Sequence, residues 1–166
     1  MNSDKNITAS FTGHREYRHS ADGALQEEIR RLYGEGYRIF LCGMARGFDL
    51  AAGECVTAIR DELPEIKLKC IIPFRGQEQS FSKRDRERHQ RLVELADEVI
   101  ILADGYHSGA YHARNDFLVE NASAMIAYYN GTKGGTHYTI HRALRRGLRI
   151  VDLCLFRVGE LFENLK

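Results

Sequence analysis

The residues most suited to binding an anion lie in a glycine turn between a run of strand-forming residues and an alanine-rich stretch that favours a helix. The turn contains Gly43, Arg46, Gly47 and Asp49. Because glycine has no Cβ, the backbone can bend tightly here and approach a ligand closely. A helix that starts after the turn presents free N–H groups and a partial positive charge, which together suit a phosphate. The segment predicts either a phosphate-binding turn or a β-to-α turn without a ligand. Its G-x3-G-x-D spacing is not the dinucleotide fingerprint of an ordinary dehydrogenase.

A second glycine-rich segment, residues 131–136, also separates strand formers from a helix-favouring stretch. Backbone amides and hydroxyl groups at a helix N-terminus are what a phosphate requires. The segment therefore predicts either phosphate contact or a plain loop, and its candidate contacts are Gly131, Thr132, Gly134, Gly135 and Thr136. Lys133 either adds a point charge to this contact or is solvated.

A shorter segment with similar properties follows the first predicted strand and contains Gly13, His14 and Arg15. The guanidinium of Arg15 can hold a phosphate through two parallel hydrogen bonds. The alternative is an ordinary surface arginine.

Carboxylates beside the first glycine turn have two interpretations each. Asp49 either caps the helix that follows or accepts a hydrogen bond from a ribose hydroxyl. Glu54, a little more than one helical turn later, either lies near the site for ribose binding or acid–base work, or is solvated. Arg46 either faces the ligand or pairs with Asp49.

Arg114, Asp116 and Glu120 share one predicted helix. An arginine with nearby carboxylates can polarise a ribose–base bond and activate water, whereas a structural Arg–Glu pair is the alternative. Arg114, Asp116, Glu120 and Glu54 are the catalytic candidates.

Histidines give a weaker signal. His137 and His141 have the i,i+4 spacing that can clamp a metal ion from one helix face. No third ligand is evident nearby in the sequence, so we expect no metal. His107 and His112, in or beside a glycine-containing loop, either contact a ligand or are exposed.

Composition limits the classes of protein. With 166 residues, 43% of them hydrophobic, the chain fits one domain over residues 1–166. A net charge of +1 gives no global attraction to nucleic acid or membrane. No apolar run reaches the roughly 18 residues that cross a bilayer, and the polar N-terminus does not resemble a signal peptide. The four scattered cysteines predict buried free thiols, so we expect a cytoplasmic protein.

Hydrophobic periodicity predicts alternating strands and helices. The residues after 155 are ambiguous and predict at most a short helix, and residues 74–82 are polar and irregular. The predicted strands are 7–11, 37–42, 67–73, 99–102, 124–129 and 149–153. The predicted helices are about 22–33, 48–63, 83–95, 111–121 and 138–146.

This alternation predicts an α/β fold with a mainly parallel sheet of about six strands and helices on both faces. Ligands of such sheets bind at the carboxyl ends of the strands, near the point where the strand order reverses. Four unusual segments follow strands: residues 12–15, 43–47, 103–109 and 131–136. We expect them to converge on one edge of the sheet.

Two motifs resemble known families. The residues from Cys42 to Asp49, after a strand and before a helix, resemble the S-G-x-A-R-G-I-D signature of DprA/Smf proteins. His112-Ala113-Arg114-Asn115, followed by Gly131-Thr132-Lys133-Gly134-Gly135-Thr136, resembles the M-H-x-R-K and P-G-G-x-G-T-x-x-E pattern of the LOG family, often labelled lysine decarboxylase-like. Both families belong to the SLOG superfamily, and the layout over residues 7–153 is most similar to its YpsA-like branch.

The resemblance implies a Rossmann-like three-layer α/β/α fold and a nucleotide or nucleotide-derived ligand such as ADP-ribose, NAD or AMP. It also implies a homodimer, with no required cofactor. The chain departs from the LOG pattern at Asn115, where the family has lysine, and at Thr139, where it has the glutamate implicated in cleaving base from nucleotide.

We therefore expect a nucleotide-binding sensor or regulatory module. The alternatives are a LOG-like hydrolase of an N-glycosidic bond and DprA-like binding of single-stranded DNA. DNA binding is less favoured because phosphate-backbone binding depends on clustered cations.

Overall fold

Six strands form one sheet in the order β4-β3-β2-β1-β5-β6, in a computed structural model that describes residues 3–154. Every neighbouring pair is parallel. The strands are β1 (Thr8–Gly13), β2 (Ile39–Cys42), β3 (Lys67–Ile72), β4 (Glu98–Ile101), β5 (Ala124–Tyr128) and β6 (Arg149–Asp152). The α-helices are α1 (Asp22–Gly34), α2 (Phe48–Ile59), α3 (Lys83–Leu95), α4 (Ala110–Glu120) and α5 (Gly135–Arg145). Short 3₁₀ turns occur at Ser3–Ile7, Arg60–Glu62 and Gln77–Ser80.

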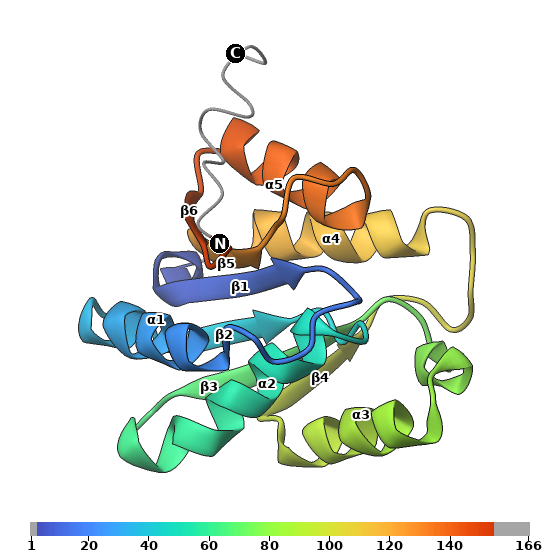
Figure 1. Ribbon diagram of the computed structural model, residues 1–166, viewed down its shortest axis with the longest axis horizontal. Coiled ribbons are helices and arrows are strands. Elements are labelled where there is room, and N and C mark those ends of the chain that lie inside the picture. The colour runs from blue at the N-terminus through green and yellow to red at the C-terminus, as the bar shows by residue number, and fades with distance from the viewer. Residues whose placement is uncertain (1–2, 155–166) are drawn as a thin grey trace.

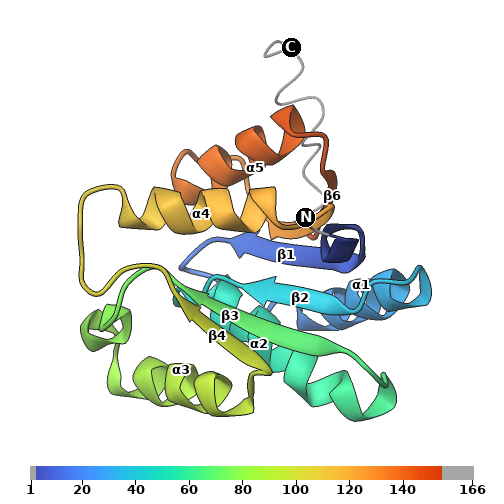
Figure 2. The same cartoon turned by 180° about the vertical axis from the view of Figure 1, so that it is seen from behind.

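The sheet is the middle of three layers. Helices α1, α2 and α3 cover one face, and α4 and α5 cover the other (Figures 1 and 2). Side chains of a strand alternate between the two faces. In β2, Phe40 and Cys42 accordingly pack into the core beneath α1 and α2, whereas Ile39 and Leu41 pack into the core beneath α4. The predicted three-layer α/β/α fold is confirmed.

The strand order reverses beside β1. From β1 the chain proceeds through β2 and β3 to β4 at one edge, and it then crosses back to β5 on the other side of β1. The adjacent connections after β1 and β5 therefore leave the sheet toward opposite faces, and such a point opens a crevice at the carboxyl ends of the strands.

Most predicted elements are present, with shifted ends. Helix α5 starts at Gly135, three residues before the expected start, because Gly134 is its N-cap, a position where glycine is tolerated. Helix α2 ends at Ile59, and a 3₁₀ turn replaces the rest of the expected helix. The predicted short helix after residue 155 lies outside the described residues.

The four cysteines are free, and Cys42, Cys55 and Cys70 are buried, as predicted. Within residues 3–154, the structure has no helix long and apolar enough to span a bilayer.

Candidate functional site

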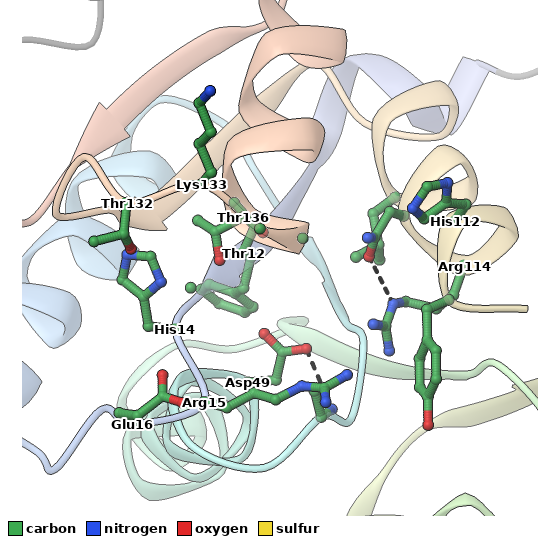
Figure 3. A pocket seen from close by; sticks show the side chains of 18 of the residues that line it. Thr12, His14, Arg15, Glu16, Asp49, His112, Arg114, Thr132, Lys133 and Thr136 are labelled. Atoms are coloured by element: carbon green, nitrogen blue, oxygen red, sulfur yellow. Dashed lines mark hydrogen bonds between the residues drawn. The ribbon is translucent and has the colours of Figure 1, made fainter. Parts of the chain in front are cut away.

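A cavity of about 820 Å³ opens where β1 and β5 end (Figure 3). Four segments form its walls: the end of β1 with the turn after it, the turn before α2, the start of α4, and the connection from β5 to α5. These are the segments that the sequence predicted to converge. Drug-sized ligands and cofactors occupy cavities of about 300–1,000 Å³, so there is room for a nucleotide.

The start of α5 forms one wall. Gly134 is its N-cap, and no side chain within the described residues caps this end. The φ angle of Gly134 is +150°, which side chains rarely adopt. Thr132, Lys133, Gly135 and Thr136 also line the cavity. The Lys133 side chain is exposed and in Figure 3 extends away from the buried charges of the opposite wall.

His14 holds this wall to the β1 turn. Its Nε2 atom accepts a hydrogen bond from the backbone N–H of Asn130, at 3.0 Å. Asn130 in turn accepts hydrogen bonds from the backbone N–H and the hydroxyl of Thr132, at 3.1 and 2.8 Å. Burial lowers the pKa of His14, which favours the neutral ring that this acceptor role requires.

Asp49 and Arg114 bring opposite charges into the interior of the cavity. They are 5% and 4% exposed, respectively. Burial raises the pKa of Asp49 to about 6, against the opposing effects of Arg114, of a hydrogen bond from Ala45 and of Arg15. The carboxylate accepts that hydrogen bond from the Ala45 N–H at 3.2 Å. Asp49 thus holds the turn before α2 and still lines the cavity.

The Arg114 guanidinium is fixed by two hydrogen bonds. It donates from Nη1 to the carbonyl oxygen of Gly43 at 2.5 Å and from Nε to Oδ1 of Asn115 at 2.8 Å. Burial lowers its pKa, while Asp49 opposes that shift. The ring of Tyr111 lies beneath both arginines of the site, 5.8 Å from the Cζ of Arg114 and 5.1 Å from that of Arg15.

Three candidates of the first glycine turn, Gly43, Arg46 and Gly47, do not line this cavity. A Cβ on Gly43 would lie 2.9 Å from both Asp49 Oδ2 and Arg114 Cδ, so the absence of a side chain here lets Asp49 and Arg114 pack closely against the turn. Gly47 has a φ of +81° and packs against the Arg15 backbone. Two of the turn's amides, those of Ala45 and Phe48, already have partners. Arg46 is exposed, and Gly131 bends the connection after β5.

Three carboxylates proposed for catalysis point elsewhere. Glu54 pairs with Arg88 of α3 at 2.5 Å. Asp116 pairs with Arg142 of α5 at 2.8 Å, and Glu120 lies 3.5 Å from the same guanidinium. The reason is helical geometry: at 3.6 residues per turn, Asp116 projects about 200° away from Arg114, and Glu54 about 140° away from Asp49. Asp116 and Glu120 thus form ion pairs with Arg142 of α5 rather than with Arg114, and Glu54 is paired rather than solvated.

Sequence reasoning missed several cavity residues. Thr12, Glu16, Tyr111 and Asn115 line it. Tyr111 follows the glycine-containing loop before α4, one of the segments expected at the edge of the sheet, and this position could have marked it as a site residue. Of the candidate histidines, His112 lines the cavity and stacks on Tyr138, with ring centroids 4.3 Å apart.

His107, His137 and His141 lie outside the cavity lining, unlike His14 and His112. His137 is hydrogen-bonded to the Tyr129 hydroxyl, and His107 is exposed. Across the described part of the chain, no three histidine, cysteine, aspartate or glutamate side chains gather closely enough to hold a metal ion.

The sequence matches the model of a known protein family. The model of the YpsA family, described as the "YspA SLOG family", matches residues 9–149. The chain belongs to the YpsA SLOG family. The resemblance seen in the glycine segments is thereby confirmed, and the cavity lies within the matched residues.

Bacterial relatives of this YpsA-family chain are 28% identical to it. The "Uncharacterized SPbeta prophage-derived protein YoqJ" of Bacillus subtilis strain 168 aligns over 116 residues, 63% of this chain and 68% of YoqJ. A UPF0398 protein of Bacillus velezensis aligns over 126 residues, 74% of this chain and 69% of that protein.

Solved structures of DNA processing protein A (DprA) share the fold. The Streptococcus pneumoniae protein superposes with a TM-score of 0.66 at 16% identity, over 98% of this chain and 56% of that chain. The Helicobacter pylori protein, whose structure describes its single-stranded DNA binding mode, gives 0.64 at 15%, over 90% and 66%. This YpsA-family chain thus spans little more than half of the first DprA chain and about two thirds of the second.

Proposed function

We propose that the protein binds a nucleotide or nucleotide-derived small molecule, of the AMP, ADP-ribose or NAD kind, and acts as a sensor or regulatory module. The observation that carries the proposal is the N-terminus of α5, which no described side chain caps, on the wall of a cavity that also contains the buried Arg114. Helix N-termini stabilise phosphates through free amides and the helix dipole. A fixed guanidinium in the same cavity adds a positive charge away from bulk water.

The carboxylate of Asp49 suits the sugar of such a ligand. It lines the same cavity, and the hydrogen bond from Ala45 uses its Oδ2 atom. A carboxylate oxygen accepts hydrogen bonds from vicinal hydroxyl groups, as acidic residues do with ribose in dinucleotide-binding folds. We therefore assign phosphate to the start of α5 and ribose to Asp49.

The position of Thr139 favours binding over base cleavage. In the LOG pattern this position carries the glutamate. Here Thr139 is fully buried, and its hydroxyl donates a hydrogen bond to the carbonyl oxygen of Gly135 at 2.8 Å. This position therefore supplies no carboxylate for cleaving an N-glycosidic bond.

Thermal unfolding with AMP, ADP, NAD or ADP-ribose tests the proposal, with adenosine as the control that lacks phosphate. A ligand at 100 times its dissociation constant adds about 2.7 kcal/mol to stability, so binding is visible. Stabilisation by phosphorylated ligands that stay intact by mass spectrometry supports a sensor, whereas release of free base indicates a hydrolase. Stabilisation by single-stranded DNA alone contradicts the proposal.

A further inference from the structure

A smaller cavity, of about 220 Å³, adjoins the cavity of about 820 Å³ described above. Arg15, Ala45 and Tyr111 line both, so the two spaces share a wall. Arg46, Gln77 and Ser80 complete the charged and polar lining of the smaller one, which we call the arginine cavity. A group bound there lies next to a ligand in the larger cavity.

The arginine cavity has cations and no matching acid. Arg15 and Arg46 line it, and none of its lining residues is an aspartate or glutamate. Among the described residues, no carboxylate lies within ion-pair distance of either guanidinium, whereas Arg88 and Arg142, for example, are each paired with two carboxylates. Asp49 of the larger cavity interacts electrostatically with Arg15 but does not line the arginine cavity. Two positive charges on the lining of one small cavity repel each other, and an anion bound there reduces that repulsion.

Gln77 gives an independent indication of a ligand. It lines the arginine cavity, is only 2% exposed, and its amide oxygen has no hydrogen-bond partner among the described residues. Leaving a buried polar atom unsatisfied is unfavourable, and each such atom in a native structure calls for an explanation. A water molecule bound to an anion can donate a hydrogen bond to this oxygen, whereas the deprotonated anion itself only accepts hydrogen bonds, which the amide NH2 group of Gln77 donates.

The backbone fixes where Arg46 stands. Met44 and Gly47, on either side of it, have φ angles of +64° and +81°. Met44 is fully buried, and a left-handed conformation is uncommon for such a residue. Asp49 holds the intervening Ala45 amide. The turn thus presents Arg46 from a constrained backbone, and Arg15 is positioned over the Tyr111 ring.

We infer that the arginine cavity binds a second anionic group of the same ligand, so the ligand carries two anionic groups at separate positions. This inference rests on the proposed function, because the first group is the phosphate at α5. A volume of about 220 Å³ accommodates a phosphoryl or carboxyl group with a few waters, each of which occupies about 30 Å³. The ligand class is a nucleotide with a second phosphoryl or carboxyl group remote from the first, rather than a simple monophosphate.

Calorimetric titration of AMP, adenosine 2′,5′-bisphosphate and adenosine 3′,5′-bisphosphate tests this. At least one bisphosphate should bind the unaltered protein about 10-fold more tightly than AMP, because it gains charge-assisted hydrogen bonds. Arg46→Gln should remove that advantage by weakening the bisphosphate about 10-fold more than AMP. Arg75→Gln, an exposed arginine that lines neither cavity, is the matched control and should preserve the advantage.

The possible failures are distinguishable. If AMP binds but neither bisphosphate exceeds it, or if Arg46→Gln leaves the advantage intact, the arginine cavity is not an anion site and the proposed function stands. If no nucleotide binds, the proposed function fails, and this inference fails with it.

Discussion

The guanidinium of Arg114 donates a hydrogen bond to the carbonyl oxygen of Gly43, a residue 71 positions earlier in the chain. The bond joins α4, on one face of the sheet, to the turn before α2, on the other face (Figure 1). Arg114 therefore holds the walls of the cavity together, and under the proposed function it would also supply a buried positive charge to the ligand.

Replacement of Arg114 by lysine should separate geometry from charge. Lysine keeps a positive charge but lacks the planar fork that bonds Gly43 and Asn115 together. We predict a loss of about 1–3 kcal/mol in unfolding free energy and weaker nucleotide binding. Urea unfolding and calorimetry measure the two effects. Arg84→Lys, on the exposed side of α3, is the control. Equal stability of Arg114→Lys and the unaltered protein would contradict the assigned role.

Gly43 should not tolerate alanine. The new Cβ would lie 2.9 Å from Asp49 Oδ2 and from Arg114 Cδ, so both charged side chains must shift. Overpacking of this kind typically costs about 1–3 kcal/mol, and we predict that nucleotide affinity falls as well. Gly23→Ala is a matched control, because nothing lies within 4 Å of its new Cβ and alanine favours the helix there. If both variants behave alike in thermal unfolding, the packing argument around Gly43 is wrong.

Asp49 should make the stability depend on pH. Burial raises its pKa from 3.8 to about 6, so between these values the folded protein retains a proton that the unfolded chain has lost. The contribution of Asp49 to the unfolding free energy therefore falls as the pH rises from about 4 to about 6, and it stays constant at higher pH. An asparagine side chain cannot titrate, so Asp49→Asn lacks this loss. The unfolding free energy of the variant minus that of the unaltered protein should therefore rise by on the order of 2–3 kcal/mol between about pH 4 and pH 7.

The comparison requires urea unfolding of both proteins at each pH, because other carboxylates titrate in the same range. Asp61→Asn, at an exposed position, is the control and should follow the unaltered protein. A difference between Asp49→Asn and the unaltered protein that does not change with pH would exclude a raised pKa.

Glu54 should be dispensable for the ligand. Its carboxylate is held by Arg88, outside the cavity lining. We predict that Glu54→Gln leaves nucleotide affinity unchanged and lowers unfolding free energy by about 0.5–1 kcal/mol, as expected for a partly exposed ion pair. The stability loss should shrink in high salt. Loss of binding in this variant, at unchanged stability, would restore Glu54 as a site residue.

The sequence predicts much of this fold because its signals are local. Periodic apolar residues mark α1, and glycine ends several elements, so their order could be predicted. The strand order could not, because pairing of β1 with both β2 and β5 depends on the whole sheet. The convergence of the loops could be predicted, because the carboxyl ends of parallel strands lie at the same edge of a sheet.

Side-chain partners were the least predictable part of the site. Glu54 and Arg88 are 34 residues apart, and Asp116 and Tyr138 are 22 apart, so nothing local pairs them. The burial of Asp49 and the unpartnered amide of Gln77 likewise depend on packing between distant segments. Arg114 could be found because the family resemblance supplied it.

The most direct test of the account is a titration of AMP into isotopically labelled protein, followed by amide resonances. Phosphate bound at the start of α5 should shift the amide protons of Gly135 and Thr136 strongly downfield, and adenosine should not. Smaller changes should appear at Ala45, beside the arginine cavity. Saturable binding whose shifts lie away from α5, or no shift with any phosphorylated ligand, would contradict the proposed phosphate site.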